Sequence, residues 1–282
     1  MHQLRKLKNK INLITIPVKS TKAITVMALF PVGSRYETKD ISGASHFVEH
    51  MLFKGTKRRP TYLEISKELD KEGAEYNAFT SRDYTGYYIK IASNKQSVAF
   101  DLIADMVFNS KLDKDEVKKE KGVITEEIRM YDDNPLMSID NLLEQLMFGK
   151  KHPMGWDIAG TTETVKKMTQ NNLFKYYKKY YRPENMVLAV AGNIDKKNLK
   201  KNLSYFTKVT QKIKPTNTKK YKKFVFDKKP KPLVDRIAVQ TKKTDQVQVI
   251  MAYPSIKHTD KRRFAKAVLI GILSGGMSSR LF

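Results

Sequence analysis

The 282-residue sequence contains no cysteine. This absence excludes disulfide bonds, thiolate nucleophiles and cysteine-bound zinc, so any metal would have to be held by histidine and carboxylate side chains. No run of about 18 apolar residues occurs, which excludes a membrane-spanning helix. The basic residues 1–10 lack the apolar region and cleavage site of a signal peptide, and they lead directly into a strand-like segment at residues 11–18. We therefore expect a cytoplasmic protein, and a mitochondrial matrix location is less favoured.

Acidic residues are few, with 29 Asp and Glu against 54 Lys and Arg, which gives a net charge of +25. Such a charge raises the hypothesis of nucleic-acid binding, because phosphate contacts need clustered Lys and Arg. The lysines are spread along the chain, however, and no nucleic-acid motif accompanies them. The charge therefore indicates a lysine-rich surface on a globular protein, and a nucleic-acid partner is not favoured.

Histidine is also scarce, with five residues in the chain, yet two of them stand four residues apart in the segment His46-Phe47-Val48-Glu49-His50. On a helix that turns about 100° per residue, His46 and His50 lie about 40° apart, and Glu49 lies about 60° to the other side of His46. Two imidazoles one turn apart can bind the same Zn²⁺, with the carboxylate beside the metal. This is the arrangement of a metal-bound water next to a general base. The alternative is a pair of histidines that only packs or faces solvent.

A third ligand is needed, because catalytic zinc sites typically use three protein side chains. The best candidates lie in the helix predicted from Asp113, where Val117, Ile124, Ile128 and Tyr131 define a buried stripe. Glu120 and Glu127 border this stripe, and Glu126 points to solvent. Two half-buried carboxylates on one face are costly without a cation, and zinc would supply one. The alternative is ion pairing, of Glu120 with Lys118, Lys121 or another surface lysine, and of Glu127 with Arg129 or a neighbouring helix.

Periodicity and capping signals predict alternating strands and helices along the chain. Ser42 is the expected N-cap of the histidine helix, with Gly55 just past its end, and residues 74–80 and 84–92 form a predicted hairpin. The other expected strands are 11–16, 23–30, 186–191, 247–252 and a short one at 221–226; the other expected helices are 61–73, 95–109, 113–131, 136–148, 161–181, 195–206 and 261–273.

Composition divides the chain into three parts. Residues 1–210 form a predicted catalytic domain, and residues 211–235 form a linker rich in Lys and Pro. Residues 236–282 would begin a second domain without a metal site. Their order of strand, helix and glycine weakly repeats that of residues 23–55.

The whole pattern resembles the pitrilysin/insulinase family of zinc peptidases, the inverzincins, which include the mitochondrial processing peptidase and insulin-degrading enzyme. In that family a ligand Glu follows H-x-x-E-H by about 76 residues, with another Glu seven residues before it. Here Glu127 follows His50 by 77 residues and Glu120 by seven. The blocks that also match are Gly43 to Thr56, Asn77 to Thr80, Val123 to Ile128, His152-Pro153 with Gly160-Thr161, and Gly275 to Phe282.

The resemblance implies a zinc-dependent endopeptidase that hydrolyses peptides or extended polypeptide segments. His46, His50 and Glu127 would hold one Zn²⁺ per chain. Glu49 would activate the zinc-bound water as general base, and Glu120 would support the site.

The resemblance also implies an edge strand at Asn77, Ala78, Phe79 and Thr80, to which a peptide substrate adds as a further strand. The alternative for Phe79 is an ordinary place in the core. Together with the predicted elements, the resemblance predicts an α+β fold. It would have a mixed, mainly antiparallel sheet with helices packed on one face, followed by the start of a second homologous α+β domain.

One departure from the family concerns the C-terminal part. Family members carry an Arg and a Tyr that hold the substrate carbonyl, shortly after the block matched by residues 275–282, and this sequence ends at Phe282. We therefore expect a partner, whether a C-terminal half, a homologous chain or a second copy, to complete the substrate chamber. The alternative function is that of an incomplete or inactive family subunit that binds peptides or a partner chain. The substrate and the cleavage rule do not follow from the sequence.

Overall fold

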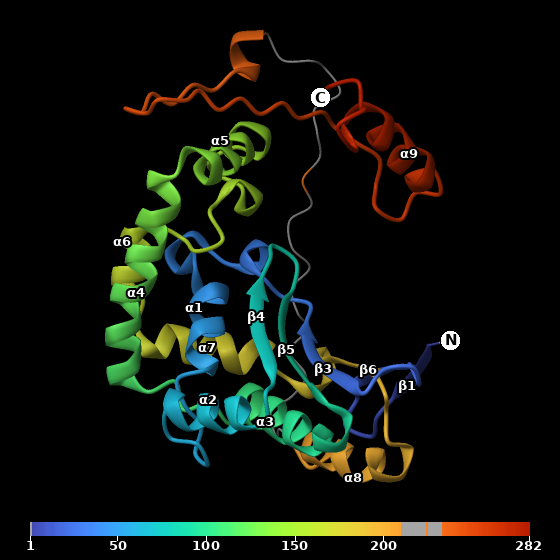
Figure 1. The fold of residues 1–282 in the computed structure, drawn as a ribbon. Coiled ribbons are helices and arrows are strands. Elements are labelled where there is room, and N and C mark those ends of the chain that lie inside the picture. The colour runs from blue at the N-terminus through green and yellow to red at the C-terminus, as the bar shows by residue number, and fades with distance from the viewer. Residues whose placement is uncertain (1, 210–223, 225–232) are drawn as a thin grey trace.

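The computed structural model describes residues 2–209, 224 and 233–282. Within this part of the chain, six strands form one sheet in the order β1-β2-β6-β3-β5-β4 (Figure 1). The pair β2·β6 is parallel and the other neighbours are antiparallel, so the sheet is mixed and mainly antiparallel, as predicted. The strands are β1 (Gln3–Lys6), β2 (Asn12–Pro17), β3 (Ala23–Phe30), β4 (Glu75–Thr80), β5 (Thr85–Ala92) and β6 (Val187–Gly192).

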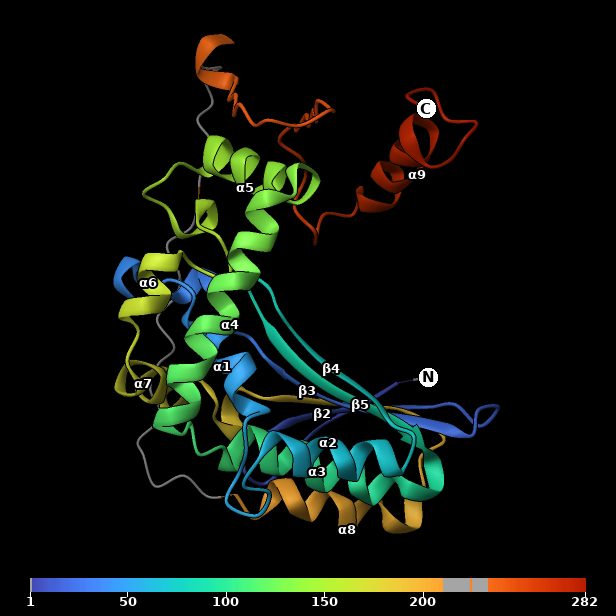
Figure 2. The ribbon, with the colours of Figure 1, turned by 60° about the vertical axis from the view of Figure 1, so that its left-hand side comes forward.

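Helices cover one face of this sheet. Figure 2 shows α2, α3 and α8 beneath the sheet, with α1, α4 and α7 stacked at one end of it. Strand β3 shows why: its residues alternate between buried and half-buried, so one face supplies the core. The helices are α1 (Ala44–Leu52), α2 (Tyr62–Lys71), α3 (Gln96–Asn109), α4 (Lys114–Asp133), α5 (Pro135–Phe148), α6 (Thr162–Lys167), α7 (Gln170–Tyr180), α8 (Lys196–Thr207) and α9 (Arg263–Ser274).

Short 3₁₀ turns connect several of these elements. They lie at Ser34–Tyr36, Lys39–Ile41, Ser93–Lys95, Pro153–Gly155, Pro183–Asn185 and Leu233–Arg236. No helix within the described residues is long and apolar enough to cross a bilayer.

Several local features differ from the predictions. The helix expected over residues 161–181 is two helices, because Thr161 and Thr169 each open a capping box of their own. Tyr131 is 38% exposed rather than buried, since the buried stripe of α4 ends at Ile128. Strand β1 was not predicted, because all four of its residues are exposed and Leu4 is its one apolar residue, so it carries no hydrophobic alternation.

The start of α1 also differs from the prediction. Its N-cap is Gly43, not Ser42, and Gly43 has a positive φ of 95°. A Cβ atom at this position would lie 2.4 Å from the carbonyl oxygen of Ala159. Glycine is therefore required both by the backbone conformation and by the close approach of the 159–160 loop.

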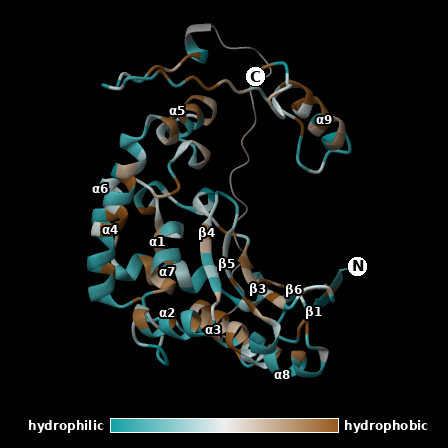
Figure 3. Ribbon diagram, in the orientation of Figure 1, coloured by the Kyte–Doolittle hydropathy of each residue, from teal (hydrophilic) through white to brown (hydrophobic). Residues whose placement is uncertain are grey.

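Residues 233–282 contain α9 but no strand. The strand predicted at 247–252 is absent, and apolar side chains of this segment, including those of Val247, Val249 and Met251, are exposed. Figure 3 shows the hydrophobic residues of α9 and the segment before it lying away from the sheet. The expected short strand at 221–226 falls outside the described residues, apart from Phe224. The domain boundaries at 210 and 235 stay predictions.

Candidate metal centre

Helix α1 is held by one apolar face. Phe47, Val48, Met51 and Leu52 are completely buried, and the helix packs against α4, α7 and β4. The side chains of His46 and His50 are only partly buried, at 13% and 20% exposure. The spacing of four residues therefore directs both imidazoles to the same side of α1, as predicted from the helical period.

Helix α4 supplies the carboxylates. Its N-terminus is capped by Asp113, whose Oδ1 accepts the backbone N–H groups of Asp115 at 2.9 Å and Glu116 at 3.3 Å. The packing of α4 on α1 places Glu120 and Glu127 toward the histidines, with Glu120 only 2% exposed. Glu126 faces solvent and pairs with Arg129 at 2.5 Å, so the three glutamates have the orientations expected from the helical wheel.

His46, His50 and Glu127 converge on one point. The Nε2 atoms of the two histidines are 3.2 Å apart, and the Glu127 oxygens lie 3.6 Å from His46 Nε2 and 3.4 Å from His50 Nε2. Two ligand atoms at 2.0–2.1 Å from a tetrahedral zinc would be roughly 3.3–3.4 Å apart. The donor set of two imidazoles and one carboxylate is also one that zinc takes. The three side chains therefore fit a zinc ion, and no other group of three such ligands is found among the described residues.

Glu120 controls which nitrogen of His50 is free. One oxygen of Glu120 contacts His50 Nδ1 at 2.8 Å, and the other contacts Lys54 Nζ at 2.8 Å. Burial raises the pKa of the Glu120 carboxyl, but the hydrogen bonds from His50 and Lys54 outweigh burial and hold that pKa below its usual value. An ionised Glu120 accepts the proton on Nδ1, so Nε2 is the nitrogen of His50 from which a metal would displace a proton.

Lys54 is a functional residue that sequence reasoning missed. The alternative to a metal was that Glu120 pairs with Lys118, Lys121 or another surface lysine, and its lysine partner is Lys54, just after α1. Helical spacing could not have found this pair, because Lys54 lies beyond the end of α1 and its contact with α4 depends on how the two helices pack.

The two histidines titrate differently without a metal. Burial lowers the pKa of His46, to about 4, and the nearby His50 adds to this effect. Burial also lowers the pKa of His50, but hydrogen bonds to Glu120 and Glu127 outweigh it and raise the pKa to about 9. A metal would thus find His46 neutral and would displace a proton from His50.

Glu49 lies beside the ligand cluster and not within it. Its carboxylate accepts a hydrogen bond from the Thr80 hydroxyl at the end of β4. Burial raises the pKa of Glu49 above its usual value, and the Thr80 hydrogen bond opposes this rise. A carboxyl group with a raised pKa is better matched to proton transfer near neutral pH.

Strand β4 is an edge of the sheet. Among the described strands its ladder partner is β5 alone, and it packs on α1. Of the four residues predicted to bind substrate, Asn77 is exposed, while Ala78, Phe79 and Thr80 are half-buried. Phe79 lies against Gly86, where a Cβ atom would be 2.3 Å from the Phe79 ring. The four residues therefore form a strand edge that no other described strand pairs with, and its end touches Glu49.

The turn after β4 is tied to a distant part of the chain. Arg82 pairs with Glu144 of α5, and its Nε donates to the carbonyl oxygen of Met154 at 3.1 Å. Arg35 pairs with Asp83 of the same turn at 2.6 Å. Sequence reasoning found no role for these charges, because the partners are separated by 48 or more residues. They fix the hairpin that carries the edge strand.

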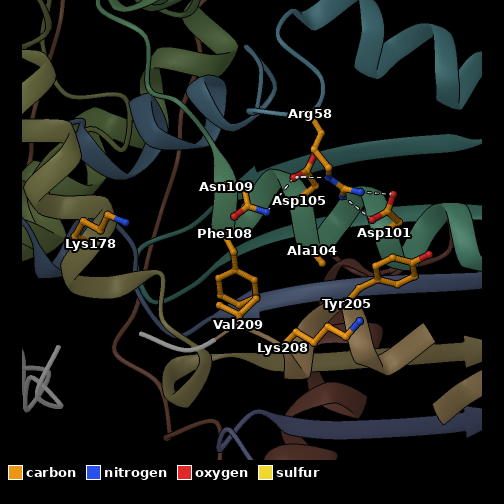
Figure 4. A pocket seen from close by; sticks show the side chains of 10 residues that line it. All are labelled: Arg58, Asp101, Ala104, Asp105, Phe108, Asn109, Lys178, Tyr205, Lys208 and Val209. Carbon is orange, nitrogen blue, oxygen red and sulfur yellow. Dashed lines mark hydrogen bonds and ion pairs between the residues drawn. The ribbon is translucent and has the colours of Figure 1, made fainter. Parts of the chain in front are cut away.

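A cavity of about 480 Å³ lies apart from this centre, among α3, α7 and α8 (Figure 4). Its wall includes an ion-pair cluster in which Arg58 contacts Asp101 at 2.6 Å and Asp105 at 3.3 Å. Arg59 contacts the same two carboxylates, each at 2.9 Å. These pairs attach the loop after α1 to α3, so we infer that they stabilise the fold.

The fold and the cluster together define a class: a protein of helices and a mixed, mainly antiparallel sheet, in which H-x-x-E-H and a glutamate on a second helix could hold a metal ion. Residues 13–162 match the family described as insulinase, peptidase family M16, and residues 167–282 match the M16 inactive domain. The chain belongs to the insulinase family, M16, and contains the start of the second domain.

Two similar proteins are named as zinc proteases. The chain is 35% identical over 283 residues to an uncharacterised zinc protease of Streptomyces coelicolor, a match covering 96% of this chain and 59% of that protein. It is 36% identical over 263 residues to the uncharacterised zinc protease YmxG of Bacillus subtilis, covering 93% of this chain and 61% of that protein. The chain thus spans about three fifths of the length of these relatives.

Solved structures share the fold. A protease from Helicobacter pylori superposes with a TM-score of 0.72 at 28% identity, covering 76% of this chain and 52% of that chain. Pitrilysin superposes with a TM-score of 0.67 at 22% identity, covering 77% of this chain and 24% of that chain, which shows the fold alone.

Proposed function

We propose that this protein is a zinc-dependent endopeptidase that hydrolyses peptides or extended polypeptide segments. The observation that carries the proposal is the convergence of His46, His50 and Glu127, with Glu49 beside them and hydrogen-bonded to the end of an open strand edge. The zinc protease names of the relatives support it.

His46, His50 and Glu127 would hold one Zn²⁺ per chain. The ion, when bound, supplies a Lewis acid that polarises a peptide carbonyl and lowers the pKa of water. Glu120 holds the His50 ring in the required tautomer and is itself held by Lys54. The chain thus contributes three ligands and one orienting carboxylate.

Glu49 acts as general base and then as general acid. Its carboxylate takes a proton from the attacking water and returns it to the leaving amine. The Thr80 hydroxyl keeps the Glu49 side chain turned toward the end of β4.

The substrate class follows from the free edge of β4. An extended peptide would pair with the backbone of Asn77 to Thr80, which brings one of its peptide bonds to Glu49. Backbone pairing reads few side chains, so we expect broad sequence specificity. The cytoplasmic location stays a prediction, tested by cell fractionation.

Residues 233–282 support a proposal about partners. Apolar side chains of this segment are exposed, among them Tyr253 at 80% and Phe264 at 69%. A C-terminal half, a homologous chain or a second copy would cover them and complete the substrate chamber. The same exposure is the observation that favours the second candidate, an incomplete subunit that binds peptides without cleaving them.

The test measures zinc content and cleavage of a quenched fluorescent peptide for the 282-residue chain, for Glu49→Gln and for Glu126→Gln. Glu126 is the matched control, because its carboxylate faces solvent. We expect one zinc per chain in all three, and a loss of turnover of roughly 10²–10⁴-fold in Glu49→Gln alone. Loss of zinc in Glu49→Gln, or normal cleavage by it, would contradict the assignment.

An extended chain carrying the further residues of a relative distinguishes the two candidates. Zinc with activity only in the extended form supports an endopeptidase that needs its second half. Zinc without activity in either form supports the binding subunit.

A further inference from the structure

A buried carboxylate lies behind the helix that carries His46 and His50. Glu37, in the segment between β3 and α1, is only 4% exposed. One of its oxygens accepts the backbone N–H of Gly43 at 2.8 Å. The other accepts the backbone N–H and the hydroxyl of Ser45, at 2.7 Å and 2.6 Å. Three donors from the start of α1 therefore converge on one side chain.

Helix α1 has no cap of its own. Its N-cap residue, Gly43, has no side chain to accept a hydrogen bond. The first N–H groups of a helix have no partner inside it, and a negative charge at that end is favourable. Glu37 thus does from outside the helix what a capping Ser or Asp normally does from within.

The cluster extends to a second helix. The single hydroxyl proton of Ser45 is donated to Glu37, so the Ser45 oxygen accepts from the hydroxyl of Tyr176, 2.6 Å away. Tyr176 is buried on α7, which packs against α1. Ser45 directly precedes His46, and its position is therefore fixed from two sides.

His46 depends on this support more than His50 does. The Nδ1 atom of His50 is held by Glu120, whereas Nδ1 of His46 is buried and finds no hydrogen-bond partner among the described residues. The position of the backbone is then the main constraint on the direction of the His46 ring. Burial raises the pKa of Glu37 to about 7 against the opposing hydrogen bonds of Ser45 and Gly43, so the chain retains a costly buried carboxyl here.

We infer that Glu37 is a positioning residue of the metal centre: with Ser45 and Tyr176 it fixes the first turn of α1 and thereby directs His46 Nε2 to the site shared with His50 and Glu127. The inference rests on the proposed function, because it takes this cluster to hold zinc.

The test compares zinc dissociation constants of the full 282-residue chain and its variants, measured by competition with a chromophoric chelator. Glu37→Gln keeps the size of the side chain but presents an amide N–H₂ to backbone donors. We expect this variant to bind zinc about tenfold more weakly, which is the size of effect seen when a group that supports a metal ligand is changed. Where cleavage is measurable, kcat should fall with KM unchanged, because the edge strand is untouched.

A matched pair on α7 separates positioning from stability. Tyr176→Phe removes the hydroxyl that reaches α1, and Tyr177→Phe removes a buried hydroxyl that donates to the carbonyl oxygen of Val107 at 3.0 Å on α3. Both should lose similar stability in urea unfolding, whereas only Tyr176→Phe should weaken zinc binding, by about threefold. This pair decides the question even if Glu37→Gln does not fold.

The outcomes distinguish the inference from the function on which it rests. Wild-type zinc affinity in Glu37→Gln or in Tyr176→Phe, or an equal loss in Tyr177→Phe, overturns the positioning role alone. Absence of zinc binding by the wild-type chain overturns the proposed metal site, and the positioning role with it.

Discussion

Two helices of this protein, α1 and α9, have similar composition and opposite surroundings. Both are amphipathic and rich in apolar residues, but α1 buries Ala44, Phe47, Val48, Met51 and Leu52 completely, while α9 buries no residue. The difference lies in what surrounds them, since α1 has α4, α7 and β4 as neighbours. Residues 2–209 hold the hydrophobic core and the three candidate metal ligands, and residues 233–282 contribute to neither. An apolar helix face is therefore a source of stability only where another element covers it.

The largest effect should come from deleting matched phenylalanines in the two helices. Phe47→Ala in α1 removes a fully buried ring and should lower the free energy of unfolding by about 3–5 kcal/mol. Phe264→Ala in α9 removes a ring that is 69% exposed and should change it by less than about 0.5 kcal/mol. Urea unfolding followed by circular dichroism measures both. Equal losses would mean that α9 is packed on the core in solution.

The next effect concerns the support of His50. Glu120→Gln should weaken zinc binding by roughly 10–100-fold, because the amide neither fixes the His50 tautomer as strongly nor attracts Lys54. Glu116→Gln is the matched control, since Glu116 lies on the same helix and pairs with Lys119 at 2.7 Å on the surface. Chelator competition should give the control the affinity of the wild type. If Glu116→Gln weakened zinc binding as much as Glu120→Gln does, the effect would come from a change in α4 as a whole and not from the support of His50.

A smaller effect should distinguish two carboxylates by their response to acid. Burial raises the pKa of Asp105, but hydrogen bonds from Thr56, Asn109 and Arg59 outweigh it and hold the pKa below its usual value. A depressed pKa adds stability that is present above the unfolded pKa of about 3.9 and is lost as pH falls through the folded pKa. Asp105→Asn should therefore be less stable than the wild type at pH 7. It should also lose less stability than the wild type does when the pH is lowered from 7 through the folded pKa of Asp105.

Asp260 supplies the comparison from the C-terminal segment. Its pKa is also lowered, by Arg262, but the pair lies on the surface of a segment without a core. Asp260→Asn should leave the pH dependence of global unfolding unchanged, as measured by melting temperature across the same range. A flattened pH profile in this variant would show that residues 233–282 unfold together with the core.

The smallest effect should follow removal of residues 233–282. The buried hydrophobic residues of the described chain all precede this segment, the last being Phe206. A chain ending at residue 232 should therefore keep the zinc affinity and the urea midpoint of the 282-residue chain. Better solubility is the expected gain, because exposed apolar surface promotes association. If the shortened chain no longer bound zinc, residues 233–282 would be needed for the metal centre, and the difference drawn between the two regions would be wrong.

Some features of the structure could be predicted from the sequence and others could not. The helical period placed Glu120 and Glu127 on the same side of α4 and Glu126 in solvent, and the structure has them so. The strand-like segments predicted at 23–30 and 84–92 match β3 and β5 to within a residue. The segment 247–252 is also mostly apolar and yet forms no strand, because a strand is stable only when a neighbouring segment completes its hydrogen bonds.

By itself the sequence determined the spacing of the two histidines, the phase of the two glutamates and the order of the elements, because these depend on regular geometry within one helix or strand. Only the tertiary structure decided that Lys54 holds Glu120, that Gly43 begins α1 against the 159–160 loop, and that Glu37 and Tyr176 meet at Ser45. Tyr176 and Ser45 are separated by 131 residues. Such contacts depend on how separate elements pack, and no period or local preference within one segment encodes their partners.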